Sequence, residues 1–191
     1  TENEIFNIHE VNDIDSLIKN HPAFYQLYFK EILMFPNDKN QDSIYKSLQM
    51  FVKDSLVKDL FEKVKKKYND MSAIKDQTDQ MYRYLLYYFP DKISLPNLYT
   101  FISEFGYQIF IFQDDGGKDG IGIGLDMFLY PDINYKMIDP DNTNFSDYIT
   151  RTWNTDHLVK KIADLHVSDI VGEAPGHRLI DQMIHNGKML Y

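Results

Sequence analysis

The chain has 191 residues and a net charge of −9, with 43% hydrophobic residues, 15% aromatic residues and no cysteine. This length suits one well-buried domain spanning residues 1–191, and the aromatic residues supply a sizeable core. The acidic balance argues against nucleic acid and anionic membranes as partners, because phosphate binding depends on clustered Lys and Arg. The missing cysteines exclude disulfides, cysteine zinc sites and thiol catalysis.

The first half of the chain, from about residue 12 to residue 90, carries apolar residues at steps of three and four. This spacing is typical of amphipathic helices packed on a core. About four helices are expected, with breaks near Pro22, between Pro36 and Asn40, and between Asn69 and Ser72. Pro90 ends the last of them.

The period then changes to that of short strands, from about residue 97 to residue 128. Strand-like segments begin at Asn97, Gln108 and Ile121, and the acidic glycine-rich turn DDGGKDG separates the last two. They predict a small three-stranded, largely antiparallel sheet. Helical spacing returns from about residue 145 to residue 191, so the fold class is α+β, mostly helical.

The stretch GIGIGLDMFLY places Gly120, Gly122 and Gly124 at alternate positions. A dinucleotide fingerprint is excluded, because Leu125 occupies the position that must be glycine and no helix follows. Alternation instead puts the three glycines on one face of a strand, which permits a close approach by another part of the structure. Close packing is the favoured interpretation, and a peptide lying along the strand is the alternative.

Two acidic loops resemble calcium loops in composition. The loop from Asp114 to Gly120 lacks the alternating carboxylates and the final glutamate that calcium requires. The stretch from Asp139 to Asp147 has the better spacing, but Asn144 replaces the essential glycine and Thr150 replaces the glutamate. Both are interpreted as polar turns.

Histidine patterns provide little support for zinc. His9 begins an H-E pair, but Asp13 stands where the second histidine of H-E-x-x-H is required. His157 and His166 are nine residues apart and lie on opposite sides of one helix. If the protein has a metal site, the candidates are His157, His166 and His185. Surface or hydrogen-bonded histidines are the favoured interpretation.

Several segments in order carry a family resemblance. LPNLYTFISEF begins at Leu95, GIGIGLDMFLYPDINY at Gly120 and LIDQMIHNGKMLY at Leu179. Together with EIFNI and HPAFYQLYFKEIL near the start, they resemble the gliding motility-associated lipoprotein B family, GldB, over essentially the whole chain.

The resemblance implies a cell-envelope lipoprotein that faces the periplasm. Its expected partners are envelope proteins of a motility or secretion machinery, and its expected contact with the membrane is a lipid anchor upstream of Thr1. It also implies that family members continue beyond Tyr191. No cofactor and no enzymatic activity are expected.

The family is distantly similar to predicted zinc metalloproteases with a zincin-like plan. On that plan GIGIGLDMF takes the place of the edge strand that binds substrate, and Asn186 stands where a glutamate ligand would be. With no H-E-x-x-H, no activated water is expected, which implies a pseudoprotease. Such a scaffold predicts a peptide groove that binds by strand addition, with the candidate residues Gly120, Gly122, Gly124, Asp126, Tyr130, Arg178 and Lys188.

Two alternatives remain open from the sequence. One is a zinc-dependent metallopeptidase that uses the irregular set His157, His166 and His185. The other is a module that binds a small ligand in a pocket between the helices and the sheet.

Overall fold

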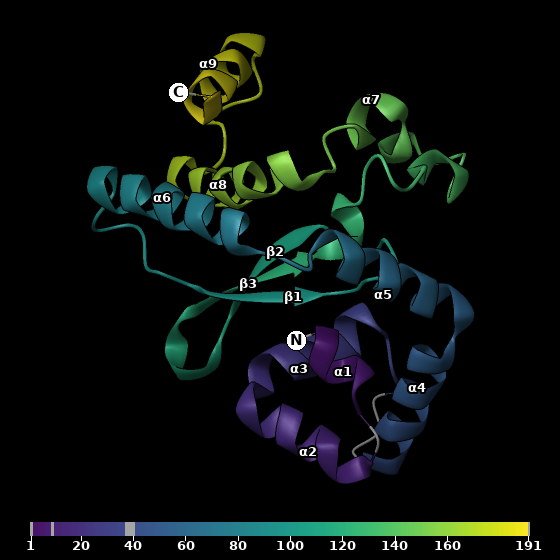
Figure 1. Ribbon diagram of the computed structural model, residues 1–191. Helices are drawn as coiled ribbons and strands as arrows, with labels where there is room; N and C mark the ends of the chain where they lie inside the picture. Colours follow the sequence, from purple (N-terminus) through teal and green to yellow (C-terminus); the bar gives the residue numbers. More distant parts are fainter. Residues whose placement is uncertain (1, 9, 37–40, 191) are drawn as a thin grey trace.

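The computed structural model describes residues 2–8, 10–36 and 41–190. Its fold is α+β and mostly helical, as predicted. A small sheet lies between the N-terminal helices and a second group of helices that includes α6 and α8 (Figure 1). The two groups of helices therefore share the sheet as a common middle layer.

The elements before the sheet are α1 Glu2–Phe6, α2 Val11–Asn20, α3 Pro22–Leu27, a π-helix Tyr28–Ile32, α4 Gln41–Lys53, α5 Ser55–Lys67 and α6 Ser72–Tyr88. The strands are β1 Asn97–Phe101, β2 Ile109–Gln113 and β3 Asp119–Gly124. The later α-helices are α7 Asp147–Thr150, α8 Thr155–Val171 and α9 Leu179–Leu190. Short 3-10 helices span Asp115–Gly117, Leu125–Phe128, Tyr135–Met137 and Thr143–Phe145.

The helix boundaries follow from local chemistry. Pro22 begins α3, where its missing N–H and fixed φ cost nothing. The break between α4 and α5 was not predicted, and it lies at Asp54, whose carboxylate accepts hydrogen bonds from the N–H groups of Leu56 at 2.8 Å and Val57 at 3.2 Å. The short helix α1 lies before the helical spacing, which was predicted from about residue 12.

The sheet has the order β1–β3–β2. β2 pairs with β3 in the antiparallel sense, as predicted, but β1 pairs with β3 in the parallel sense, so the sheet is mixed. The expectation that the glycine strand lies at an edge is wrong, because β3 is the central strand. Both of its hydrogen-bonding edges are occupied, so a peptide cannot be added to it.

The glycine face of β3 is filled by rings from the neighbouring strand. A Cβ at Gly120 would overlap the ring of Phe112, and a Cβ at Gly122 would overlap the ring of Phe110. Both rings pack against the cluster of N-terminal helices, where Phe24 stacks on Tyr99 with ring centroids 4.6 Å apart. The glycines therefore allow two aromatic rings to lie close over the central strand, which supports the interpretation as close packing.

The other face of the sheet packs on the second group of helices. Ile121 and Ile123 of β3 point there and join a core with residues of α5, α6 and α8. The 3-10 helix Leu125–Phe128, directly after β3, is buried in the same core. The chain after β3 is therefore held firmly, and it provides a fixed support for the groove beside α5.

Candidate functional site

A groove of about 580 Å³ lies beside α5. Its lining residues come from three segments, namely α5, the loop after β1 and the segment 132–138: Leu56, Val57, Asp59, Leu60, Lys63, Glu104, Phe105, Asp132, Ile133, Asn134, Met137 and Ile138. This volume falls in the range of about 300–1,000 Å³ that is common for binding pockets.

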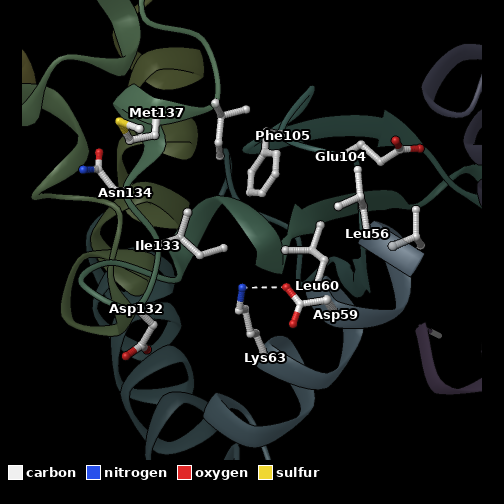
Figure 2. A pocket seen from close by; sticks show the side chains of 12 residues that line it. Leu56, Asp59, Leu60, Lys63, Glu104, Phe105, Asp132, Ile133, Asn134 and Met137 are labelled. Atoms are coloured by element: carbon white, nitrogen blue, oxygen red, sulfur yellow. Dashed lines mark hydrogen bonds and ion pairs between the residues drawn. The ribbon is translucent and has the colours of Figure 1, made fainter. Parts of the chain in front are cut away.

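The groove has an apolar floor and a charged rim. Figure 2 shows Leu60, Phe105 and Ile133 turned toward one another across it. At the rim, Lys63 Nζ lies 2.6 Å from Asp59 Oδ2, and this exposed ion pair contributes little to stability. Partial burial, and then the nearby Asp54, raise the pKa of Glu104. The arrangement fits an apolar group better than a charged substrate.

The loop after β1 has an unusual backbone. Glu104 and Phe105 are consecutive non-glycine residues with φ of 52° and 65°, in the left-handed region. Asp126 holds them there, because its carboxylate accepts hydrogen bonds from the N–H groups of Phe105 at 2.7 Å and Ser103 at 3.1 Å. The Ser103 hydroxyl donates to the same carboxylate at 3.1 Å. Asp126 therefore positions Phe105 in the groove, although Asp126 itself does not line the groove.

Asp126 is fully buried. Burial raises its pKa to about 6, while the hydrogen bonds from Phe105 and Ser103 act in the opposite direction. Its backbone carbonyl accepts a hydrogen bond from the Tyr135 hydroxyl at 2.8 Å, and that hydroxyl accepts one from Leu129 N–H at 2.8 Å. One short segment therefore fixes both the loop after β1 and the segment 132–138.

Replacing Glu104 by glycine is expected to raise the free energy of unfolding by about 0.5–1 kcal/mol. Glycine removes the left-handed penalty of about 1–2 kcal/mol, and its greater chain entropy offsets part of the gain. Chemical denaturation would measure the change, with Glu104→Ala as the matched control that keeps φ positive at a residue with a Cβ. Equal changes in the two variants would contradict the explanation.

A second surface is formed by α9, which packs against α8 (Figure 1). Its half-buried side, toward the rest of the protein, carries Asp181, Gln182, His185 and Met189. Its outward side carries five apolar residues that are 53% to 84% exposed, namely Leu179, Ile180, Met183, Ile184 and Leu190. Polar and apolar sides are thus reversed relative to an ordinary surface helix, whose apolar stripe faces the core.

The structure does not bring the predicted groove residues together. Gly120 and Gly122 lie under aromatic rings, and Asp126 is fully buried. Gly124 directly precedes the 3-10 helix Leu125–Phe128, and Tyr130 is the second residue after it. Tyr130 is partly exposed, and its carbonyl accepts a hydrogen bond from Lys67 Nζ at 2.8 Å.

The two basic candidates lie elsewhere. Lys188 is on α9 and Arg178 directly precedes it, and α8 lies between α9 and the sheet (Figure 1). Arg178 makes a bidentate pair with Asp181, with both N···O distances 2.8 Å. Neither side chain is placed to act with β3 on one ligand.

The family model described as gliding motility protein GldB matches residues 1–191. The chain belongs to the GldB family. The members of this family are gliding motility lipoproteins, so this protein is a gliding-motility-associated protein of the cell envelope. No curated protein and no solved structure matches the chain. Among the described residues, no helix has both the length and the apolar character needed to cross a bilayer.

The described histidines of this GldB-family chain are not gathered into a metal site. His166 is buried, and its Nε2 lies 2.9 Å from the Tyr82 hydroxyl. Burial lowers the pKa of His166. His157 Nδ1 lies 2.9 Å from Asn154 Oδ1 at the start of α8, whereas His185 is on α9. Within the described ranges, no group of three His, Asp or Glu side chains is arranged to hold a metal ion.

The remaining metal candidates of the sequence have ordinary roles or lie outside the described residues. His9 is outside them, and Asp13 accepts a hydrogen bond from Glu10 N–H at 2.9 Å at the start of α2. In the loop from Asp139 to Asp147, Asn142 caps a 3-10 helix by accepting from Asn144 N–H at 3.0 Å. This second loop is a polar turn, as predicted.

Sequence reasoning missed the groove beside α5 and the outward side of α9. The groove joins residues more than 70 positions apart, and no local pattern marks Leu56 and Met137 as neighbours. The apolar stripe with Leu179, Met183 and Ile184 was visible, but it indicates only a helix with one apolar side. An apolar stripe does not say whether it faces the core or the solvent.

Proposed function

We propose that this GldB-family protein is a non-catalytic component of the gliding machinery that acts by binding other proteins. The observation that carries the proposal is the outward apolar side of α9. Contiguous exposed apolar surface costs free energy in water, so on a folded domain it usually marks a binding surface. The apolar groove beside α5 is a second such surface on the same chain.

The proposal includes attachment to the membrane by a lipid upstream of the chain, with the domain facing the periplasm. It also includes partners drawn from envelope proteins of the motility or linked secretion machinery. Family membership supports both points. The degenerate zincin-like plan stays a hypothesis. Its substrate-binding edge strand is no longer part of that hypothesis, because β3 is the central strand.

Photo-crosslinking in living cells tests the binding role. A crosslinking amino acid at Met183, on the outward side of α9, is expected to capture protein partners in the envelope. The matched control is Met50 of α4, which is also an exposed methionine on a helix. If Met183 captures no more protein than Met50, α9 is not a binding surface and the proposed function fails.

A separate experiment tests the non-catalytic part. Elemental mass spectrometry of protein purified without chelator is expected to find less than about 0.1 zinc per chain, and a peptide library is expected to stay uncleaved. About one zinc per chain, lost together with cleavage in His185→Ala, would contradict this part. The irregular set His157, His166 and His185 would then be the site to study.

A further inference from the structure

The outward side of α9 has a shape suited to packing on an apolar surface. At 100° per residue, its five apolar side chains fall within about 140° of the helix circumference. Gly187 lies near the middle of this arc, and the space where its Cβ would be is open. The stripe is therefore a ridge of side chains with a notch at its centre, which is the kind of surface that docks into a groove.

The charges beside this stripe point outward with the same sign. In the Arg178–Asp181 pair, the arginine side chain is 80% exposed, whereas the aspartate side chain is only 12% exposed. Lys188 on α9 is also exposed. A partner that approaches the apolar side of α9 therefore meets basic groups, while the aspartate stays turned toward the protein.

The groove beside α5 has the complementary character. Its floor is apolar, and its rim carries three carboxylates, of which Asp59 pairs with Lys63 and Asp132 pairs with Lys67. The third is Glu104. Glu104 leaves the rim with one carboxylate in excess, and this net negative charge beside an apolar floor favours an apolar segment flanked by basic residues. The outward side of α9 is such a segment.

The groove and α9 of one chain lie apart. In Figure 1, α9 lies beyond α8 on the far side from the sheet, whereas α5 lies at the side of the sheet near α4. The short connection of residues 172–178 holds α9 against α8. In this arrangement the groove is open to an α9 that belongs to another molecule.

We propose that α9 of one molecule docks, apolar side first, into the groove beside α5 of a second copy. This proposal rests on the proposed binding function and names the partner as a second copy of the chain. The contact joins two different surfaces, so it is head-to-tail and extends into rings or filaments. Each added molecule uses one of its two surfaces and leaves the other free, so an open assembly ends in one unused groove and one unused α9.

Variants at exposed positions can test the two halves separately. Met183→Asp places a charge in the apolar side of α9, and Leu56→Asp places one at the groove. Both residues are mostly exposed, so the fold is expected to survive, and circular dichroism would verify this. Met50→Asp, at an exposed methionine of α4, is the matched control.

Sedimentation velocity at increasing concentration measures the result. The native chain and Met50→Asp are expected to show masses above one chain, whereas Met183→Asp and Leu56→Asp each weaken association at least about tenfold. An equimolar mixture of the two variants is expected to stop at two chains. The reason is that only one intact groove and one intact helix remain in each pair.

Cysteine trapping gives a second readout, because the chain contains no cysteine of its own. Met183→Cys mixed with Leu56→Cys is expected to give the mixed disulfide in at least about tenfold excess over either homodimer. If the native chain stays monomeric and the mixture of the two cysteine variants gives no excess of the mixed disulfide, the self-association is overturned.

The pattern of failures separates the two proposals. Association lost in Met183→Asp but kept in Leu56→Asp, or lost in Met50→Asp, overturns the docking of α9 into the groove. If crosslinks from Met183 reach other envelope proteins while the native chain is monomeric, the binding function stands and the second copy fails. If Met183 captures nothing in cells, the binding function itself fails.

Discussion

Replacing Gly124 by alanine is expected to lower the free energy of unfolding by about 3 kcal/mol or more. A Cβ at this position would overlap the carbonyl oxygen of Tyr107. That oxygen belongs to backbone held nearby, because Gly124 N–H donates to the carbonyl of Gln108 at 3.0 Å. Overpacking against fixed backbone costs about 1–3 kcal/mol and sometimes more. Chemical denaturation with a fixed m-value would measure the loss.

Gly187→Ala is the matched control for this prediction. Gly187 lies inside α9, and a Cβ added there would point into open space, away from the rest of the protein. Alanine there is expected to leave the free energy of unfolding unchanged or to raise it by up to about 1 kcal/mol, because glycine is a poor helix former. A loss of less than about 0.5 kcal/mol in Gly124→Ala would show that the chain after β3 can move. That result would contradict the role of this segment in holding the groove in place.

Replacing Asp126 by asparagine is expected to lower the free energy of unfolding by about 2–4 kcal/mol at neutral pH. Both carboxylate oxygens accept backbone hydrogen bonds, one from Ser103 and one from Phe105. An amide group has one oxygen, so its NH₂ must face one of these N–H groups, and a buried donor loses its acceptor. Asp132→Asn is the control, since the Asp132 side chain is 59% exposed and pairs with Lys67 at 3.0 Å.

The pH dependence gives a second test of Asp126. The pKa of its carboxyl group is about 6 in the folded protein, against 3.8 for the unperturbed group. Between these two pH values the folded state binds more protons than the unfolded state. The contribution of Asp126 to the free energy of unfolding is therefore fully present below the lower pKa and is lost as the pH rises through about 6. The shift of about 2 units corresponds to roughly 3 kcal/mol.

This pH dependence of the free energy of unfolding is expected in the native chain and is expected to be absent from Asp126→Asn. The difference in unfolding free energy between the two is expected to widen as the pH falls from about 7 to about 4, by up to roughly 3 kcal/mol. Urea denaturation at several pH values would measure it. A constant difference would mean that Asp126 does not titrate in this window, and the link between its burial and its pKa would be wrong.

The sequence predicted most element positions because their signals are local. The predicted strand starts at Asn97, Gln108 and Ile121 lie within two residues of the starts of β1, β2 and β3, whereas β1 and β3 end about four residues earlier than predicted. The break at Pro22 was found because proline fixes φ and removes a hydrogen-bond donor. The break at Asp54 was missed, since the apolar spacing runs on through it and a single N-cap aspartate is a weak signal.

Strand order and the candidate site depend on contacts that no local pattern records. Three strands in sequence suggest hairpins, but β3 pairs on both sides, so the glycine strand became central. Asp126 was named as a groove residue from its place beside the glycines, and it acts instead as a buried acceptor under Ser103 and Phe105. The groove exists only after α5 and the segment 132–138 are brought together.

The place of β3 also bears on how the chain acquires its fold during synthesis. β3 is the last strand to be made, and it is the one that both β1 and β2 require. Until residue 124 has emerged, the two earlier strands have no hydrogen-bonding partner in the sheet, although the rings of Phe110 and Phe112 are already present. Unpaired apolar strands promote aggregation. A nascent chain that ends near Lys118 is therefore its most vulnerable intermediate, and it is the stage at which protection by a chaperone would matter most.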